Sequence, residues 1–250
     1  MKTTKDAAGT VSRVATILST LAEAAQPLGV KQISLAAELP MSTTHRLLDL
    51  LSESGFVQRI AKIHKYSLGP DFLRIAATTT YKNPLHRIVQ PTLNDLTERT
   101  DETSAFALYH QSRHDISYHA KADSRQPLRF RLPLNQREHL QSNAFGHAVL
   151  ASLSDAARDS AASAGLVLPK ATDGGLLDMV LQRIRDEGYA VSKENEPSGV
   201  AYIAAPVRAI DDSPLGAIGL VIPVVRFERS KVEAYGALVF EAAKKIGNLL

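Results

Sequence analysis

The sequence contains no cysteine among its 250 residues. This absence excludes disulfides, thiolate-bound metal ions, iron–sulfur clusters and cysteine nucleophiles. Long apolar runs are also missing, because the longest, AIGLVIPVV at 217–225, falls well short of the ~18 residues that a membrane span requires. The first residues, MKTTKDAAGTVSR, lack the apolar core of a signal peptide. We therefore expect a cytoplasmic protein that does not enter a membrane.

The motifs of common catalytic and cofactor sites are absent as well. There is no Gly-rich phosphate loop, no HExxH metal motif and no Gly-x-Ser-x-Gly nucleophile elbow. His110, His114 and His119 lie close in sequence, but HQSRHD is typical of a turn between strands, so we interpret them as surface histidines. Ser104, His110 and Asp115 have the residue types of a catalytic triad, but no nucleophile motif supports that role. We expect no catalytic residue, metal or cofactor.

The excess positive charge lies in the first third of the chain. The net charge is +3, and residues 1–76 hold nine Lys and Arg against six Asp and Glu, whereas the remainder is balanced. A basic segment joined to a neutral one favours a polyanion-binding module with a separate partner domain. Because the excess is small, chance remains the alternative explanation on charge alone.

Periodicity in the first third predicts a winged helix-turn-helix. Apolar spacing indicates helices at 11–25 and 31–38, and a third from Thr43 to Ser54 with Ser42 as its N-cap and Gly55 at its end. Two β-like runs, 56–60 and 64–68, follow as a hairpin.

The remaining sequence alternates helical and strand patterns, which is typical of an α+β domain. Helices are predicted at 85–100, 144–153, 155–164, 175–187 and 228–249, and strands near 103–109, 115–121, 200–209 and 215–223. We divide the chain into a winged helix-turn-helix domain at 1–70, a linker helix at 71–83 and an α+β domain at 84–250, since Asn83-Pro84 favours a boundary.

The third helix has the composition of a DNA recognition helix. Its first turn would enter the major groove, where short hydroxyl side chains allow close approach and longer donors reach bases or phosphates. The residues concerned are Ser42, Thr43, Thr44, His45 and Arg46, with Arg59, Lys62, His64 and Lys65 of the hairpin on the adjacent phosphates. The alternative is an ordinary three-helix module in which Ser-Thr-Thr only caps the helix.

The motif LPMSTTHRLLDLLSESGFVQR…KYSLGPDFLRIA resembles the N-terminal domain of the IclR-type bacterial transcription regulators. The likeness continues through EHLQSNAFGHAVLASL, IRDEGYAVSKENEPSGVAYIAAPV and PLGAIGLVIPVVRF, so it covers residues 11–249 in family order. It implies a GAF-like effector-binding second domain, a small organic acid as effector, and homodimers or tetramers on palindromic double-stranded DNA operators.

Three positions depart from the family pattern. Glu38 stands where a glycine usually ends the second helix, and a positive φ there would cost a non-glycine residue on the order of 1 kcal/mol. His147 replaces a lysine, and Ser192, followed by Lys193, occupies a position that is often acidic. The last two suggest a ligand unlike those best known in the family.

The resemblance also implies where the effector binds. The wall would comprise Leu128, Phe130, Leu140, Asn143, Ala144, Phe145, Gly146, Ser192, Lys193, Val200 and Tyr202. Backbone N–H groups at a helix start favour a carboxylate, and the aromatic residues suit an aromatic or alicyclic acid. The apolar members have core packing as their alternative role.

The best interpretation is a ligand-responsive, DNA-binding transcription regulator. Two alternatives from other classes remain open, namely an enzyme on a GAF-like scaffold and a small-molecule sensor that acts through protein contacts. The Ser42–Arg46 turn argues against the sensor, and turnover of a bound acid would reveal the enzyme.

Overall fold

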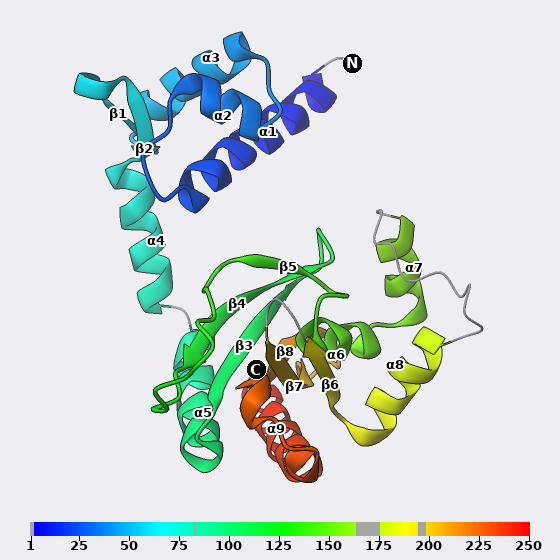
Figure 1. Cartoon of the computed structure of the whole chain (residues 1–250). Coiled ribbons are helices and arrows are strands. Elements are labelled where there is room, and N and C mark those ends of the chain that lie inside the picture. Colours follow the sequence, from blue (N-terminus) through cyan, green and yellow to red (C-terminus); the bar gives the residue numbers. More distant parts are fainter. Residues whose placement is uncertain (1–2, 83, 164–175, 195–198) are drawn as a thin grey trace. The chain divides into compact units, whose positions relative to one another are not determined.

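The computed structural model describes residues 3–82, 84–163, 176–194 and 199–250, and Figure 1 shows its elements. Contacts within the chain divide it into two compact units, Met1–Asn83 and Pro84–Leu250. Each unit has a hydrophobic core of its own. None of the described helices is long and apolar enough to cross a membrane.

The first unit has the predicted winged helix-turn-helix fold (Figure 1). Its described elements are α1 (Thr3–Glu23), α2 (Val30–Ala36), α3 (Met41–Glu53), β1 (Val57–Ile60), β2 (Lys65–Leu68) and α4 (Pro70–Lys82). β1 and β2 form an antiparallel hairpin joined by a 3-10 turn at Ala61–Ile63. Two backbone hydrogen bonds between Leu28 and Tyr66 tie this hairpin to the segment before α2.

One face of α3 packs into the core of this unit. Thr44, Leu47, Leu48 and Leu51 are buried on that face. They follow the three- and four-residue spacing of one helical stripe. The leucines join a core to which α1 and α2 also contribute. This packing fixes the rotation of α3 about its own axis.

The start of α3 differs from the prediction. The helix begins at Met41 after Pro40, whose φ of −58° is already close to helical, and no side chain caps it. Ser42 therefore lies inside the first turn, and its assignment as the N-cap is wrong. The predicted end is confirmed, because Gly55 has φ 72° and the Phe56 N–H donates to Leu51 O at 2.9 Å.

Glu38 occupies the left-handed conformation that its family position implies. Its φ is 52°, and its N–H donates to Leu35 O at 3.2 Å. The following Leu39 N–H donates to Ser34 O at 3.0 Å, and the Ser34 hydroxyl returns a bond to Leu39 O at 2.6 Å. The α2–α3 turn therefore keeps a positive φ without glycine, and the steric cost falls on Glu38.

The second unit is an antiparallel sheet between two helical layers (Figure 1). Its strands are β3 (Thr103–His110), β4 (Asp115–Ala122), β5 (Arg137–His139), β6 (Ala190–Glu194), β7 (Val200–Arg208) and β8 (Pro214–Pro223), in the order β5-β4-β3-β8-β7-β6. Its described helices are α5 (Pro84–Thr100), α6 (Ala144–Ser152), α7 (Asp155–Ser163), α8 (Leu176–Glu187) and α9 (Val232–Gly247). The α+β prediction is confirmed.

Strand alternation sorts the core into two halves, because successive side chains point to opposite faces. Ala105, Ala107 and Tyr109 of β3 lie in one core with α6 and α8. Phe106, between them, lies in the other core with α5 and α9. The sheet is thus buried on both faces, as its nearly continuous apolar strands indicate.

Sequence patterning missed the two edge strands. β5 has three residues and β6 is AVSKE, and neither shows the apolar run of a buried strand. The last helix also starts later than predicted, at Val232, because two 3-10 turns at Val224–Arg226 and Arg229–Lys231 precede it. α5 passes through the exposed Pro91 and remains one helix.

Replacing Glu38 by glycine is expected to raise the free energy of unfolding of the first unit by about 1 kcal/mol, because glycine tolerates positive φ. Urea denaturation followed by circular dichroism would measure it. Glu53→Gly, at a helical position of α3, is the matched control and should lower stability by about 1 kcal/mol. A Glu38→Gly protein no more stable than the wild type would contradict this account of the turn.

Candidate functional site

The first turn of α3 presents polar side chains to solvent. Ser42, His45 and Arg46 are exposed, and Thr43 is half-buried. His45 Nδ1 lies 3.0 Å from Asp49 Oδ2, one turn farther along the same helix face. Within the part of the chain that the structure describes, the Arg46 side chain has no ion-pair or hydrogen-bond partner. Its five N–H donors are therefore available to an external ligand.

Thr44 does not belong to this exposed surface. Its side chain is 0% exposed, and its hydroxyl donates to Pro40 O at 3.1 Å. A buried hydroxyl that is already bonded within the protein cannot reach a base edge or a phosphate. The assignment of Thr44 to the DNA surface is therefore wrong, and the reason is that Thr44 falls on the buried stripe of α3.

The hairpin gathers basic side chains at its turn. Arg59, Lys62 and His64 are exposed, and Lys65 is half-buried. Arg59 Nη2 lies 3.2 Å from His64 Nδ1, across a turn in which His64 adopts a φ of 49°. These four groups offer several donors and no carboxylate, which suits contact with phosphate oxygens.

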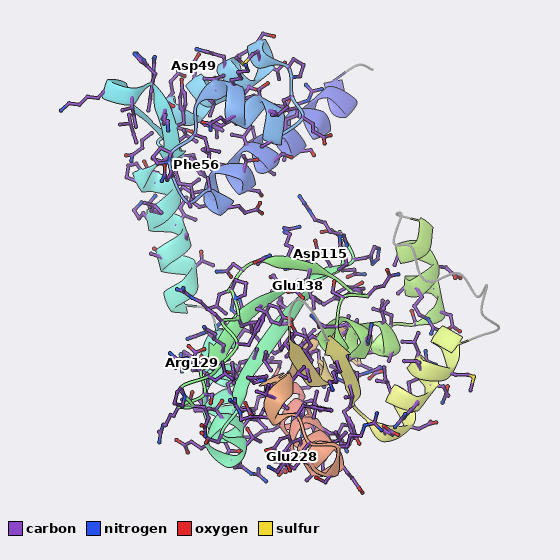
Figure 2. All side chains as sticks on the ribbon, viewed as in Figure 1. Asp49, Phe56, Asp115, Arg129, Glu138 and Glu228 are labelled. Carbon is purple, nitrogen blue, oxygen red and sulfur yellow. The ribbon has the colours of Figure 1, made fainter. Side chains whose placement is uncertain are left out.

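The hairpin is held firmly on the rest of the first unit. The Phe56 and Phe72 rings pack edge to face at 6.2 Å, which joins the start of the hairpin to α4, and Figure 2 labels Phe56 at this junction. Tyr66 of β2 is 2% exposed in the shared core. The basic turn therefore projects from a rigid support.

The second candidate site lies at the start of α6, where side chains already cap the helix. Asn143 is the N-cap, and its Oδ1 accepts the Phe145 N–H at 3.0 Å. The Ser192 hydroxyl of β6 accepts the Ala144 N–H at 2.8 Å. The helix end thus directs two N–H groups at protein oxygens, which marks where an anionic oxygen would fit.

A buried polar network extends from the same asparagine. Asn143 Nδ2 donates to Tyr118 Oη at 3.0 Å and to Glu138 Oε2 at 2.6 Å, and the Tyr118 hydroxyl also reaches Glu138 at 3.3 Å. Burial is the largest cause that raises the pKa of Tyr118, with the Glu138 charge second, so the hydroxyl stays protonated and donates. Figure 2 labels Glu138, the central residue of β5. Sequence reasoning named neither Tyr118 nor Glu138.

Aromatic rings pack beside this network. The Phe145 ring stands edge to face with Tyr118 at 5.3 Å and with Tyr202 at 6.1 Å. Leu140 and Val200 are buried in the same core, and Phe130 packs against it partly exposed. The five predicted residues among them form an apolar and aromatic wall next to the α6 start, namely Phe130, Leu140, Phe145, Val200 and Tyr202.

Gly146 allows the α6 start to lie against the preceding segment. A Cβ on Gly146 would collide with the backbone carbonyl of Leu140. Only glycine fits this close approach, so the Ala-Phe-Gly sequence sets how α6 meets the residues before it.

Two predicted wall residues lie outside the buried group. Leu128 is 59% exposed, and its backbone carbonyl accepts a hydrogen bond from Arg226 at 2.6 Å. Lys193 is exposed on β6, with its Nζ 5.9 Å from the centroid of the Phe227 ring. Lys193 points to the opposite face of β6 from Ser192, which faces the start of α6, and Leu128 lies on the surface. The wall is smaller than predicted.

The histidines and the residues considered for a catalytic triad form hydrogen bonds with other groups. His114 is buried, which corrects its assignment to the surface, and its Nδ1 lies 2.9 Å from the Tyr109 hydroxyl. His110 Nε2 lies 2.8 Å from Ser117 Oγ. The Ser104 hydroxyl donates to Leu93 O at 2.8 Å in α5. In the described part of the chain, no group of three or more His, Asp or Glu residues could hold a metal ion.

Comparison with family models identifies both parts of the chain. The model described as the IclR helix-turn-helix domain matches residues 10–61. The model described as the bacterial transcriptional regulator IclR C-terminal matches residues 77–248. Together they cover both of the units seen in the structure.

Characterised relatives and solved structures agree with these matches. The transcriptional repressor IclR of Escherichia coli K12 is 27% identical over 92% of this chain and 85% of its own length. The regulator KdgR of the same strain is 26% identical over 96% and 92%. An IclR transcriptional regulator from Alicyclobacillus acidocaldarius has a TM-score of 0.80, with 21% identity over 96% of this chain and 97% of that one.

One structural neighbour contains a ligand. It is an IclR homolog from Microbacterium hydrocarbonoxydans complexed with 4-hydroxybenzoate, with a TM-score of 0.74 and 21% identity over 95% of this chain and 97% of that one. At this identity the likeness shows the shared fold.

The environment of His147 leads us to predict that the stability of the protein depends on pH. Burial lowers its pKa, while the hydrogen bond to Gln141 O at 3.1 Å raises it less. The pKa of His147 in the folded protein thus lies below the unfolded value of about 6.5. The neutral side chain therefore contributes to the free energy of unfolding above pH ~6.5, and this contribution is lost as pH falls through the folded pKa. His147→Gln should lose less stability than the wild type between pH 7.5 and 5, as measured by urea denaturation.

The exposed His139→Gln variant, measured in the same way, is the control for removing a histidine from this segment of the chain. His110 and His119, whose pKa values burial also lowers, remain in both proteins and cancel in the comparison. Identical loss of stability in wild type and His147→Gln would refute this role for His147.

Proposed function

The chain belongs to the IclR family of bacterial transcription regulators, and from that premise we propose how its two units work. The first unit inserts the start of α3 into the major groove of an operator, and the second binds a small organic acid at the start of α6. The observation that carries the proposal is the exposed Arg46, which has no side-chain partner among the described residues and lies on a helix whose opposite side is buried in the core.

Physical chemistry gives each exposed group of α3 a separate task. Arg46 is long enough to bond O6 and N7 of a guanine through two parallel hydrogen bonds, or a phosphate. Ser42 and Thr43 lie in the first turn, where short hydroxyl side chains and the positive helix end favour a phosphate. His45 directs its Nδ1–H at Asp49, so its other ring nitrogen, Nε2, faces the groove as an acceptor for a base amino group. The basic hairpin turn holds the adjacent backbone and carries no sequence information.

The operator that suits this protein is palindromic. A second copy of the chain would double the contacts and match two half-sites through its own two-fold symmetry. Leu73 and Ile75 of α4 are 56% and 44% exposed, and such apolar side chains are typical of a surface that another protein covers. We therefore propose a homodimer or a tetramer that acts on the chromosome in the cytoplasm.

The effector that suits the second unit is a small carboxylate with an apolar or aromatic body. The Phe145 and Tyr202 rings would contact that body, and the α6 start would receive the carboxylate. Because the Ala144 N–H already bonds Ser192, the carboxylate would replace the serine hydroxyl as acceptor. Binding of 4-hydroxybenzoate by a structural neighbour supports this ligand class.

Regulation would be a coupling free energy between the two sites. The effector must bind more tightly to one arrangement of the DNA-binding units than to the other, and by reciprocity DNA then changes effector affinity. The linker segment 71–83 contains most of α4, and we propose that this helix transmits the change between the two sites. Turnover of a bound acid by the purified protein would instead support an enzyme.

Arg46→Ala should weaken specific DNA binding by about 1–3 kcal/mol, or roughly 5- to 150-fold, because it removes the guanidinium contact. Fluorescence anisotropy with a duplex selected by the wild-type protein from a random pool would measure the loss. Arg74→Ala is a suitable control, since it removes an exposed guanidinium from α4 of the same unit. Equal affinity of Arg46→Ala and wild type, with unchanged thermal unfolding, would remove Arg46 from the interface.

A double substitution tests the hairpin. Lys62→Ala with Lys65→Ala should weaken binding to specific and scrambled duplexes alike and reduce the magnitude of the salt slope by about 2, because each phosphate contact contributes ~0.9. Lys245→Ala, in the second unit, should leave the slope unchanged. A slope that survives the double substitution would place the hairpin away from the DNA.

A further inference from the structure

A cavity of about 470 Å³ lies at the far end of α6 from the predicted effector site. Apolar side chains of Ile184, Pro206, Phe240 and Ala243 form part of its wall, together with the C-terminal residues of α6 and α9. The volume falls in the range of about 300–1,000 Å³ that is usual for small-molecule sites. None of the residues predicted to bind the effector lines this cavity.

Three cations line the cavity, and no carboxylate does among its described lining residues. They are Arg185, Arg208 and Lys244, which come from α8, β7 and α9. Asp212, outside the lining, pairs with Arg208, whereas Arg185 and Lys244 form no ion pair among the described residues. This net positive charge next to an apolar wall favours an anion that carries an apolar body.

Two of these cations also stabilise the end of α6. Arg185 Nε donates to Ala151 O at 3.0 Å, and Arg208 Nη2 donates to Ser152 O at 3.0 Å. Arg208 Nη1 bonds Asp212 at 2.7 Å. These contacts offset the partial negative charge of the helix end and leave further guanidinium donors unused.

Lys244 is the third cation of the cavity, and it packs against an aromatic ring. Its Nζ lies 4.3 Å from the centroid of the Phe240 ring, and it has no carboxylate partner in the described residues. An ammonium above an aromatic ring presents its remaining donors to the cavity, and an anion with an aromatic body would meet both groups at once.

Two glycines allow the close packing that forms the cavity wall. Gly188 ends α8 with a φ of 82°, and a Cβ there would press on the Phe240 ring at 2.7 Å. A Cβ on Gly247 would collide with the Arg208 carbonyl. These close approaches let α9 lie against β7 and α8, so the cavity wall is fixed by packing rather than by a ligand.

We propose that this cavity is a second ligand site, which binds a small carboxylate with an apolar or aromatic body of about the size of benzoate. The carboxylate is held by Lys244 and by the free donors of Arg208, and the apolar body rests on Phe240 and Ile184. This site is separate from the effector site at the start of α6, and it does not require DNA binding.

The chain has no tryptophan, so a single introduced one provides a fluorescence signal from this cavity. Ile210 lines the cavity at its rim and is 79% exposed, so Ile210→Trp should fold normally. Titration of the full-length Ile210→Trp protein with benzoate is expected to change its fluorescence saturably. Benzamide, the neutral analogue, should bind at least about tenfold more weakly, because it lacks the charge that Lys244 recognises.

Neighbouring lysines of α9 provide the matched variants. In the Ile210→Trp background, Lys244→Gln should weaken benzoate binding about tenfold, while Lys245→Gln should leave it unchanged. Ala209→Phe, which fills the cavity from its rim without removing charge, should also abolish the signal. No saturable change with benzoate, or equal affinities in Lys244→Gln and Lys245→Gln, would overturn the proposal. Neither result bears on DNA binding, which is measured separately.

Discussion

The burial of one stripe of α3 is the constraint on which the account of the first unit depends. Thr44, Leu47, Leu48 and Leu51 must all face the core, and an α-helix has only one rotation that achieves this. That rotation turns Arg46 and its exposed neighbours outward. The surface proposed to bind DNA is therefore a geometric consequence of core packing. The same packing explains why Thr44 lies inside, although its sequence neighbours lie outside.

The second unit uses packing in a similar way to fix the two ends of one short helix, where the two ligand sites are proposed. Almost every side chain of α6 is buried, so the helix is held along its length and only its ends are left to interact. At its start, Asn143 and Ser192 hold N–H groups in place, and at its end Arg185 and Arg208 hold carbonyls. A ligand at either end would exchange hydrogen bonds with the helix rather than create them, which makes binding sensitive to the position of α6.

Sequence patterns predicted the elements whose energetics are local or strongly periodic. The leucines of α3, the apolar runs of β3 and β7 and the turn at Gly55 all carry their signal within a few residues. β5 and β6 carry no such signal, since they are short and lack an apolar run, and only pairing with β4 and β7 makes them strands. The network of Tyr118, Asn143 and Glu138 escaped prediction because Tyr118 is distant in sequence from both of its partners. Of the predicted residues, Thr44 is buried by the rotation of α3, Leu128 lies exposed on the surface, and Lys193 is exposed because its neighbour Ser192 takes the strand face toward α6.

The most direct test of the central claim, that the exposed start of α3 reads operator DNA, is to capture fragmented genomic DNA on the purified protein at physiological salt. The capture is run with and without a small-molecule extract of the source cells, and the retained fragments are sequenced. The account predicts strong enrichment of a few palindromic sites in at least one of the two conditions. Uniform recovery of sequence in both conditions would contradict it, because it would mean that α3 contributes no base recognition and that the basic charge of the first unit acts on phosphates alone.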